Sequence, residues 1–227
     1  MAQHQKSRSR PEAKPKSPAK STRPAKPKWR RRADARPDEI LDAALAVFNE
    51  RGFDAARMDD IANRAGISKG AVYLYFDAKE ALLRGLIERE VSPTAMRLKA
   101  LAETGADDPL AALKLIVQTA TQLLNDQHIF AVPKLVISVA ARFPELGEFY
   151  RKRVVDEAIG AFAQLHREGV ARGVFRDVDS DAAARAVLGP IFLFTVRKHL
   201  LGARTERVST MARAEAHLDI LLNGLSA

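Results

Sequence analysis

A short stretch around residue 70 carries side chains whose chemistry suits contact with DNA. Lys69 and Gly70 follow a Gly-Ile-Ser sequence, and Tyr73 and Tyr75 come shortly after them. A lysine can donate to a guanine or a phosphate, and a glycine lets the backbone approach a base edge closely. Tyrosine hydroxyls can donate to phosphates, and two tyrosines on the outward face of a helix favour a partner for that face. This pattern predicts a surface that contacts a DNA duplex.

The layout of about residues 57–76 is that of a helix-turn-helix. Apolar residues at helical spacing run from Met58 to Ala65, which predicts a first short helix. Gly66 can end that helix in the left-handed conformation, Ile67 can fill the space between the helices, and Ser68 can cap the second helix. The second helix is therefore the one expected to enter the major groove.

This second helix has an apolar inward side and a polar outward side. Val72 and Phe76 are four residues apart and are expected to face the body of the protein. The other side chains are small, polar or basic, as a helix in the major groove requires. The residues of the motif that we expect to contact DNA are Ser68, Lys69, Gly70, Ala71, Tyr73 and Tyr75.

Helical patterns extend on both sides of this motif, and no alternating strand pattern occurs. Pro37 can occupy the first position of a helix that runs to about residue 51, with Gly52 as its cap. Asp77 and Glu80 predict a capped helix directly after the motif. Further helices are expected at about residues 109–125, 129–142, 144–172, 180–201 and 209–223, so the predicted fold class is all-α.

The net charge of +9 is concentrated at the N-terminus. Residues 1–36 carry 13 Lys and Arg against Glu12 and Asp34, with Trp29 as their one aromatic residue. They cannot bury enough apolar surface to offset the entropy of ordering, so they are expected to be a disordered basic tail. Such a tail can be a solubilising arm or an arm that binds DNA phosphates. Residues 37–85 carry six basic and nine acidic residues, so DNA binding requires the cations to gather at the groove face.

The sequence holds no pattern that supports catalysis, a cofactor or a metal. There is no cysteine, and the histidines after residue 100 have no partner at metal-ligand spacing. Glycine-rich phosphate loops, nucleophile elbows and paired carboxylates are missing from the sequence. The N-terminal sequence lacks the apolar stretch of a secretory signal, and the longest apolar run is about half a membrane span. We therefore expect a cytoplasmic protein that is not an enzyme and has no membrane partner.

Residues 37–85 resemble the DNA-binding domain of the TetR/AcrR family of regulators. The resemblance rests on Gly52 and Phe53, Met58 to Ala62, Ala65 to Phe76, and Lys79 and Glu80 at fixed spacing. It continues more weakly in Ala141 to Leu146 and on to Tyr150, and in Leu188 to Pro190. It implies a DNA-binding domain at 37–84, an effector-binding and dimerisation domain at 85–227, and a repressor that a small molecule releases.

The sequence departs from the family pattern at two points. The family often has hydroxyl residues before the second helix, where this chain has Ala56 and Arg57. Arg57 can supply the phosphate contact instead, while the helix cap passes to Asp59 or stays weak. The family often has Thr or Asn at the position of Ala71, whose methyl group favours readout of a thymine methyl or of DNA shape. The resemblance also places Lys79 among the DNA-contacting residues.

Large apolar residues in the second domain are candidates for an effector cavity. Core packing is the commoner role at any one of them, and the cavity itself is expected from the resemblance. Pro133 and Pro190 lie within helical patterns, where a kink could open space for a ligand. This composition favours a largely apolar effector. The candidate effector-binding residues are Phe130, Val136, Phe143, Phe162 and Phe192.

The last two predicted helices are apolar enough to pair with their copies in a second subunit. The residues expected at that interface, or in the core behind it, are Ala183, Val187, Ile191, Phe194, Leu218, Leu221 and Leu222. A homodimer would place two recognition helices about one DNA turn apart and read a pseudo-palindromic operator. The leading hypothesis is a ligand-responsive transcriptional repressor. The alternative is an effector-independent or architectural DNA-binding protein dominated by its basic tail.

Overall fold

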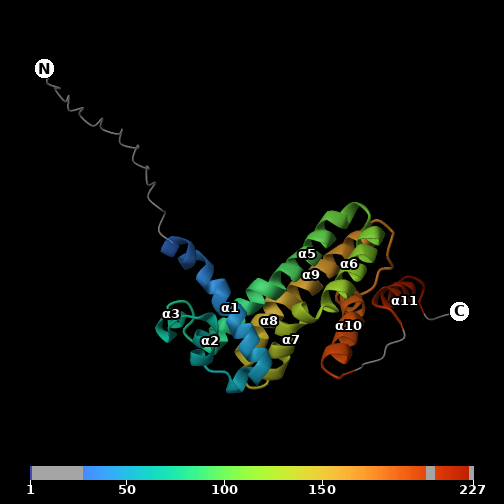
Figure 1. The fold of residues 1–227 in the computed structure, drawn as a ribbon. Helices are drawn as coiled ribbons and strands as arrows, with labels where there is room; N and C mark the ends of the chain where they lie inside the picture. Colours follow the sequence, from blue (N-terminus) through green and yellow to red (C-terminus); the bar gives the residue numbers. More distant parts are fainter. Residues whose placement is uncertain (2–27, 203–207, 225–227) are drawn as a thin grey trace. The chain divides into compact units, whose positions relative to one another are not determined.

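The computed structural model describes Met1, residues 28–202 and residues 208–224, and its regular elements in these ranges are all helical (Figure 1). The expected all-α class is confirmed, because these ranges contain no strand. None of their helices is both long enough and apolar enough to cross a membrane. Residues Arg36–Ala227 form one compact unit. Most of the predicted disordered tail, residues 2–27, lies outside the described residues.

Helix α1 (Lys28–Ala55) begins earlier than the sequence indicated and contains Pro37. The residues between Lys28 and Pro37 are mostly Arg and Ala, which are good helix formers, so the helix does not need Pro37 as its first residue. The predicted end of the tail at residue 36 therefore falls inside α1. The helical backbone is interrupted at Gly52, where φ is 77°, a conformation that favours glycine. This interruption lies where the sequence predicted the helix to end.

The turn between α2 (Met58–Ala65) and α3 (Lys69–Tyr73) forms as the sequence predicted. Gly66 ends α2 in the left-handed conformation, with φ 68°. Ser68 caps α3, because its Oγ accepts a hydrogen bond from the backbone N–H of Ala71 at 3.2 Å. Val72 is fully buried, and Ile67 and Phe76 are partly buried against the same core. The inward and outward sides of α3 are therefore those expected from the spacing.

The α2 cap follows the weak alternative, and the expected α4 cap is wrong. Arg57 and not Asp59 occupies the capping position of α2, and its side chain accepts no capping hydrogen bond. The backbone N–H of Arg57 donates to the carboxylate of Asp60 at 3.2 Å. Asp59 instead forms an ion pair with Lys69. Helix α4 (Lys79–Leu86) begins after Ala78, whose methyl side chain cannot accept a hydrogen bond. The box expected from Asp77 and Glu80 does not form, because the helix starts one residue too late for Asp77 to be its cap.

Two long helical segments run side by side through the compact unit, and each contains a π-helical turn. The first comprises α4, the π turn η1 (Ile87–Val91) and α5 (Ser92–Thr104), and the second comprises α8 (Pro144–Tyr150), the π turn η3 (Arg151–Val155) and α9 (Asp156–Ala171). Arg153 in η3 donates from Nε to the carboxylate of Glu88 in η1 at 2.6 Å. An ion pair between side chains therefore links the two π turns directly.

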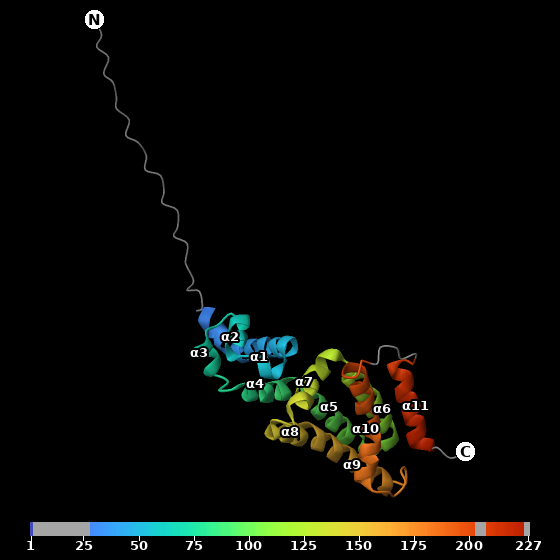
Figure 2. The ribbon, with the colours of Figure 1, turned by 90° about the horizontal axis from the view of Figure 1, so that it is seen from below.

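The remaining helices lie close to the predicted ranges. They are α6 (Pro109–Leu124), α7 (Gln127–Val139), α10 (Ser180–His199) and α11 (Thr210–Asn223), with a short 3-10 turn η2 (Gly105–Asp107) before α6. Within the compact unit, α2 and α3 lie at one end and α10 and α11 at the other, as both ribbon views show (Figures 1 and 2). A DNA contact at α3 and a subunit contact at α10 and α11 would therefore use separate surfaces.

The buried apolar residues divide into two cores. The first core contains the apolar residues of α1 to α4 and η1 together with Val132, Val136 and Val139 of α7 and Leu146 of α8. The second core lies among α5, α6, α9, α10 and α11. Helices α7 and α8 thus complete the core of the N-terminal helices, although the sequence placed them in the domain that begins at residue 85.

Candidate DNA-binding surface and effector cavity

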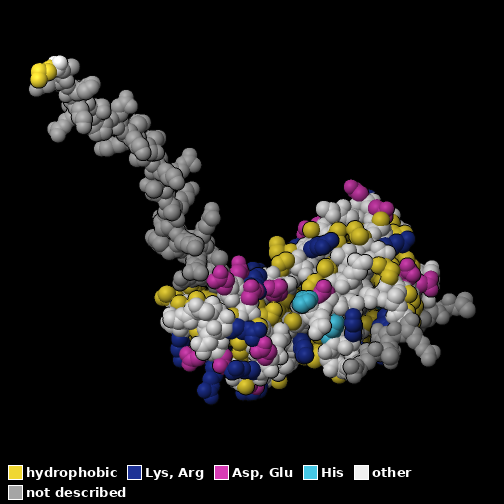
Figure 3. Space-filling model, in the orientation of Figure 1, with side chains coloured by type: hydrophobic (Ala, Val, Ile, Leu, Met, Phe, Trp, Pro, Cys, Tyr) yellow, Lys and Arg dark blue, Asp and Glu magenta, His cyan; other side chains and the backbone are white. Residues whose placement is uncertain are grey.

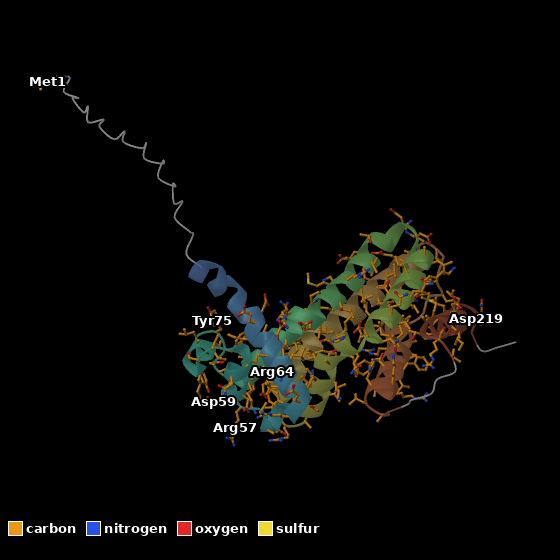
Figure 4. The ribbon with its side chains drawn as sticks, in the orientation of Figure 1. Met1, Arg57, Asp59, Arg64, Tyr75 and Asp219 are labelled. Carbon is orange, nitrogen blue, oxygen red and sulfur yellow. The ribbon has the colours of Figure 1, made fainter. Side chains whose placement is uncertain are left out.

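The outward side of α3 and the residues directly after it form an exposed aromatic and apolar surface. The side chains of Tyr73 and Tyr75 are 44% and 40% exposed, and that of Leu74 is 82% exposed. Figure 4 shows Asp59 near Arg57 at the outer side of these short helices, with Tyr75 farther away at the same end of the compact unit. Leu74 was not among the predicted contacts, because a leucine within a helical pattern is most often a core residue. The exposed Leu74 side chain adds apolar area to this surface beside the two tyrosines.

The small residues of the motif leave the backbone of α3 accessible. Gly70 is exposed, and a Cβ atom built on it would meet no protein atom within 4 Å. Packing inside the protein therefore does not require glycine at this position. Ala71 is half-buried. Ser68 accepts the capping hydrogen bond through a lone pair, so its hydroxyl hydrogen can still be donated to a phosphate.

Acidic side chains pair with several cations of this region. Asp59 forms an ion pair with Lys69, with a distance of 3.0 Å between Oδ2 and Nζ. This hydrogen bond and the charge of Asp59 raise the pKa of Lys69. Asp60 forms a second pair with Arg51 at 2.8 Å. Basic and acidic side chains are interspersed on the face seen in Figure 3, so the positive charge at the predicted groove face is partly compensated.

The two flanking cations named from the sequence have different surroundings. Arg57 is exposed at the start of α2, and its guanidinium forms no ion pair among the described residues. Lys79 is directed to the end of α1, where its Nζ donates to the carbonyls of Phe53 at 2.7 Å and Asp54 at 3.1 Å. The ammonium also lies 4.9 Å from the centre of the Phe53 ring. Arg57 is thus available to an outside partner, whereas Lys79 stabilises the last turn of α1.

The structure does not bring the five candidate effector residues into one cavity. Val136 is buried in the first core, and Phe143 packs edge-on against Phe53 there with a centroid distance of 5.5 Å. Phe130 is buried beside His199, and Phe192 is 39% exposed on α10. Phe162, in the second core, lines the larger cavity described next.

This cavity has a volume of about 420 Å³ and lies among α6, α9, α10, α11 and the connector before α10. Its apolar lining includes Leu113, Phe162, Leu165, Val187 and Leu221, and the connector adds Val174, Phe175 and Val178. The Phe175 ring packs on the backbone of Gly169, where an added Cβ would lie 2.1 Å from Phe175 Cδ2. The connector residues were not predicted from the sequence. Phe175 is partly buried against the second core, whereas Val174 and Val178 are 44% and 45% exposed at the edge of the cavity.

Comparison with known proteins agrees with this arrangement of an N-terminal helix-turn-helix and a larger helical part. Residues 40–86 match the model of bacterial regulatory proteins of the tetR family, and residues 111–221 match that of the AefR-like transcriptional repressor C-terminal domain. The HTH-type transcriptional regulator YfiR of Bacillus subtilis is 31% identical over 147 residues, covering 64% of this chain and 70% of the relative. The chain belongs to the TetR family of transcriptional regulators, which are DNA-binding proteins and not enzymes.

Two further relatives cover most of the chain. The HTH-type transcriptional repressor KstR2 of Rhodococcus jostii is 28% identical over 194 residues, covering 83% of this chain and 90% of the relative. The structure of the transcriptional regulator FadR from Bacillus subtilis in complex with stearoyl-CoA has the same fold, with a TM-score of 0.62. It is 20% identical and covers 83% of this chain and 99% of that chain.

Proposed function

We propose that this protein is a ligand-responsive repressor that binds a pseudo-palindromic operator as a homodimer and is released by a small, largely apolar effector. The observation that carries the proposal is the two-sided structure of α3. Val72 is fully buried, while Lys69 and Tyr73 face solvent on a helix that is capped and held by the turn at Gly66. Exposed polar groups on a fixed helix can reach base edges and phosphates.

Exposed apolar side chains on the last two helices support the dimer. Leu193 on α10 is 56% exposed and Ile220 on α11 is 47% exposed, and Phe192 and Leu222 on the same two helices are also exposed. Several residues that the sequence named for the interface, including Val187, Ile191 and Leu218, are buried in the second core. We therefore assign the subunit contact to the exposed residues of α10 and α11, for which a second copy would remove apolar surface from water.

The cavity among α6, α9, α10 and α11 is the proposed effector site. Its volume of about 420 Å³ lies in the range of small-molecule sites, and its lining is mostly apolar. Leu221 and Val187 belong both to this lining and to the helices of the proposed dimer contact. An effector there could alter the spacing of two subunits, and linkage then makes effector and operator binding mutually unfavourable.

The test begins with selection of an operator from random duplexes, followed by affinity measurements for two variants. Tyr73→Phe and Lys69→Ala should each weaken operator binding by about tenfold, because each contact of this kind contributes about 1–3 kcal/mol. Their melting temperatures should stay within about 2 °C of the parent, since both side chains are exposed. Loss of binding that always accompanies loss of fold would contradict the assignment of α3.

A salt titration separates this proposal from the effector-independent alternative. Specific binding through α3 should keep its preference for the operator over scrambled DNA as salt rises. A protein that binds through its basic tail would lose affinity for both duplexes in parallel and show little preference at any salt concentration. That second result would replace the repressor with an architectural DNA-binding protein.

A further inference from the structure

A second cavity, of about 400 Å³, lies where α1, α7 and α10 meet and is separate from the proposed effector site. None of its lining residues lines the larger cavity. Three helices supply its lining. The lining residues are Asn49 of α1, Gln127, His128, Phe130, Ala131 and Lys134 of α7, and His199 of α10. The lining thus combines side-chain amides, imidazoles and one amine with an aromatic ring.

The charge of this lining is positive. Lys134 is exposed and forms no ion pair among the described residues, and no acidic side chain lines the cavity. The carboxylate of Asp126, next to Gln127 in the chain, is not part of this lining and accepts a capping hydrogen bond from the backbone N–H of His128 at 2.7 Å. The side chains of Asn49 and Gln127 likewise have no partner among the described residues, so their amide groups are available to a ligand.

One wall of the cavity is flat and fixed. The imidazole of His199 is stacked on the Phe130 ring, with 5.3 Å between the ring centroids and 30° between their planes. Its Nε2 lies 3.1 Å from the carbonyl oxygen of Asn125, which can only accept, so Nε2 carries the hydrogen. Phe130 itself is buried and cannot turn away. A planar group can therefore lie against this wall without rearrangement of the protein.

We propose that this cavity binds a small carboxylate with a planar apolar body. Lys134 supplies one formal positive charge, which matches a monoanion, and the amides of Asn49 and Gln127 supply hydrogen-bond donors. A phosphate dianion fits less well, because the cavity lining has no arginine and only one lysine. The occupant would touch α1 of the DNA-binding part and α7, whose Val132 and Val136 complete the core of that part.

The site is tested with sodium benzoate as the probe and the full-length protein, by NMR of the histidine side chains. The resonances of His128 and His199 should shift with benzoate. Those of His166, which lines the larger cavity, and of His217, which bonds to Val187, should not. Single His→Gln variants assign these four resonances among those of the five histidines of the chain. Neutral benzamide, which has the same shape without the charge, should bind at least about fivefold more weakly.

A pair of lysine variants supplies the matched control. Lys134→Gln should raise the dissociation constant for benzoate about fivefold, because it removes one charge-assisted interaction at a partly exposed site. Lys114→Gln removes the same charge from an exposed position on α6, outside the cavity, and should change it less than twofold. Any one of four results would overturn the proposal. They are equal effects of the two lysine variants, benzamide binding as tightly as benzoate, inorganic phosphate binding more tightly than benzoate, and shifts at His166 in place of His128 and His199.

Discussion

Replacement of Lys79 by methionine separates two roles that the same side chain could have. The family resemblance assigns Lys79 to the DNA backbone, whereas the structure directs its ammonium to the carbonyls of Phe53 and Asp54 at the end of α1. Methionine keeps much of the length of the side chain and removes its charge and its donors. We expect Lys79→Met to lower the free energy of unfolding and to leave operator affinity nearly unchanged when the protein is fully folded.

The expected loss of stability follows from the contacts of the ammonium. A hydrogen bond to a charged donor contributes about 1.5–3 kcal/mol, and the second carbonyl shares the same ammonium. The position of Nζ, 4.9 Å from the centre of the Phe53 ring, adds about 0.5–1 kcal/mol. Because Lys79 is only half-buried, water replaces part of these interactions in the variant. We therefore expect the free energy of unfolding to fall by about 2–3 kcal/mol.

Urea unfolding at one fixed protein concentration measures this loss. With a slope of about 2 kcal/mol per M, the midpoint should fall by about 1–1.5 M. Lys114→Met is the matched control, since Lys114 is exposed and pairs with no described residue, and its midpoint should fall by less than about 0.3 M. An unchanged midpoint for Lys79→Met, together with a loss of operator affinity of tenfold or more, would refute the capping role and restore Lys79 to the DNA contact.

Three further predictions concern separate surfaces. Asp59→Asn should tighten operator binding severalfold in a titration at low salt, because it frees the ammonium of Lys69 and removes a carboxylate from the side of α3; unchanged or weaker binding would contradict this. Leu193→Asp should convert a dimer to a monomer in light scattering while the helical circular dichroism signal is kept, and a dimer that persists would move the interface elsewhere. Deletion of residues 2–27 should leave the preference for the operator intact and reduce the slope of log K against log salt by several units. The slope changes by about 0.9 for each phosphate that the shortened protein no longer neutralises. Identical slopes for the two proteins would mean that these residues do not touch DNA.

Local sequence signals predicted the local structure of the helix-turn-helix well. Gly66 has the left-handed conformation, Ser68 caps α3 and Val72 is buried, because each of these outcomes depends on residues within one or two helical turns. The expected helix at 109–125 is found at Pro109–Leu124 for the same reason. Helix starts were less predictable, since Pro37 is compatible both with a first turn and with the interior of α1.

Features that depend on contacts between distant residues could not be predicted. Nothing in the periodicity of α7 distinguishes a helix that packs on its own domain from one whose Val136 completes the core of the preceding domain. The partners of Lys79 are carbonyl oxygens, which every residue has and which leave no mark in the sequence. The effector candidates were chosen by residue type, and type alone did not reveal that Phe192 is exposed on α10.

The paired π turns constrain the length of the chain and not only its composition. A π turn holds one more residue than an α turn, and each residue in a helix advances the side chains by about 100°. Deleting one residue from Ile87–Val91 would restore a continuous α-helix and rotate the apolar side of α5 by that angle relative to α4, out of the second core. The neighbouring segment Arg151–Val155 would not rotate with it, because it is a separate insertion in another helix. Single-residue gaps should therefore be rare at either segment in related sequences that keep this core.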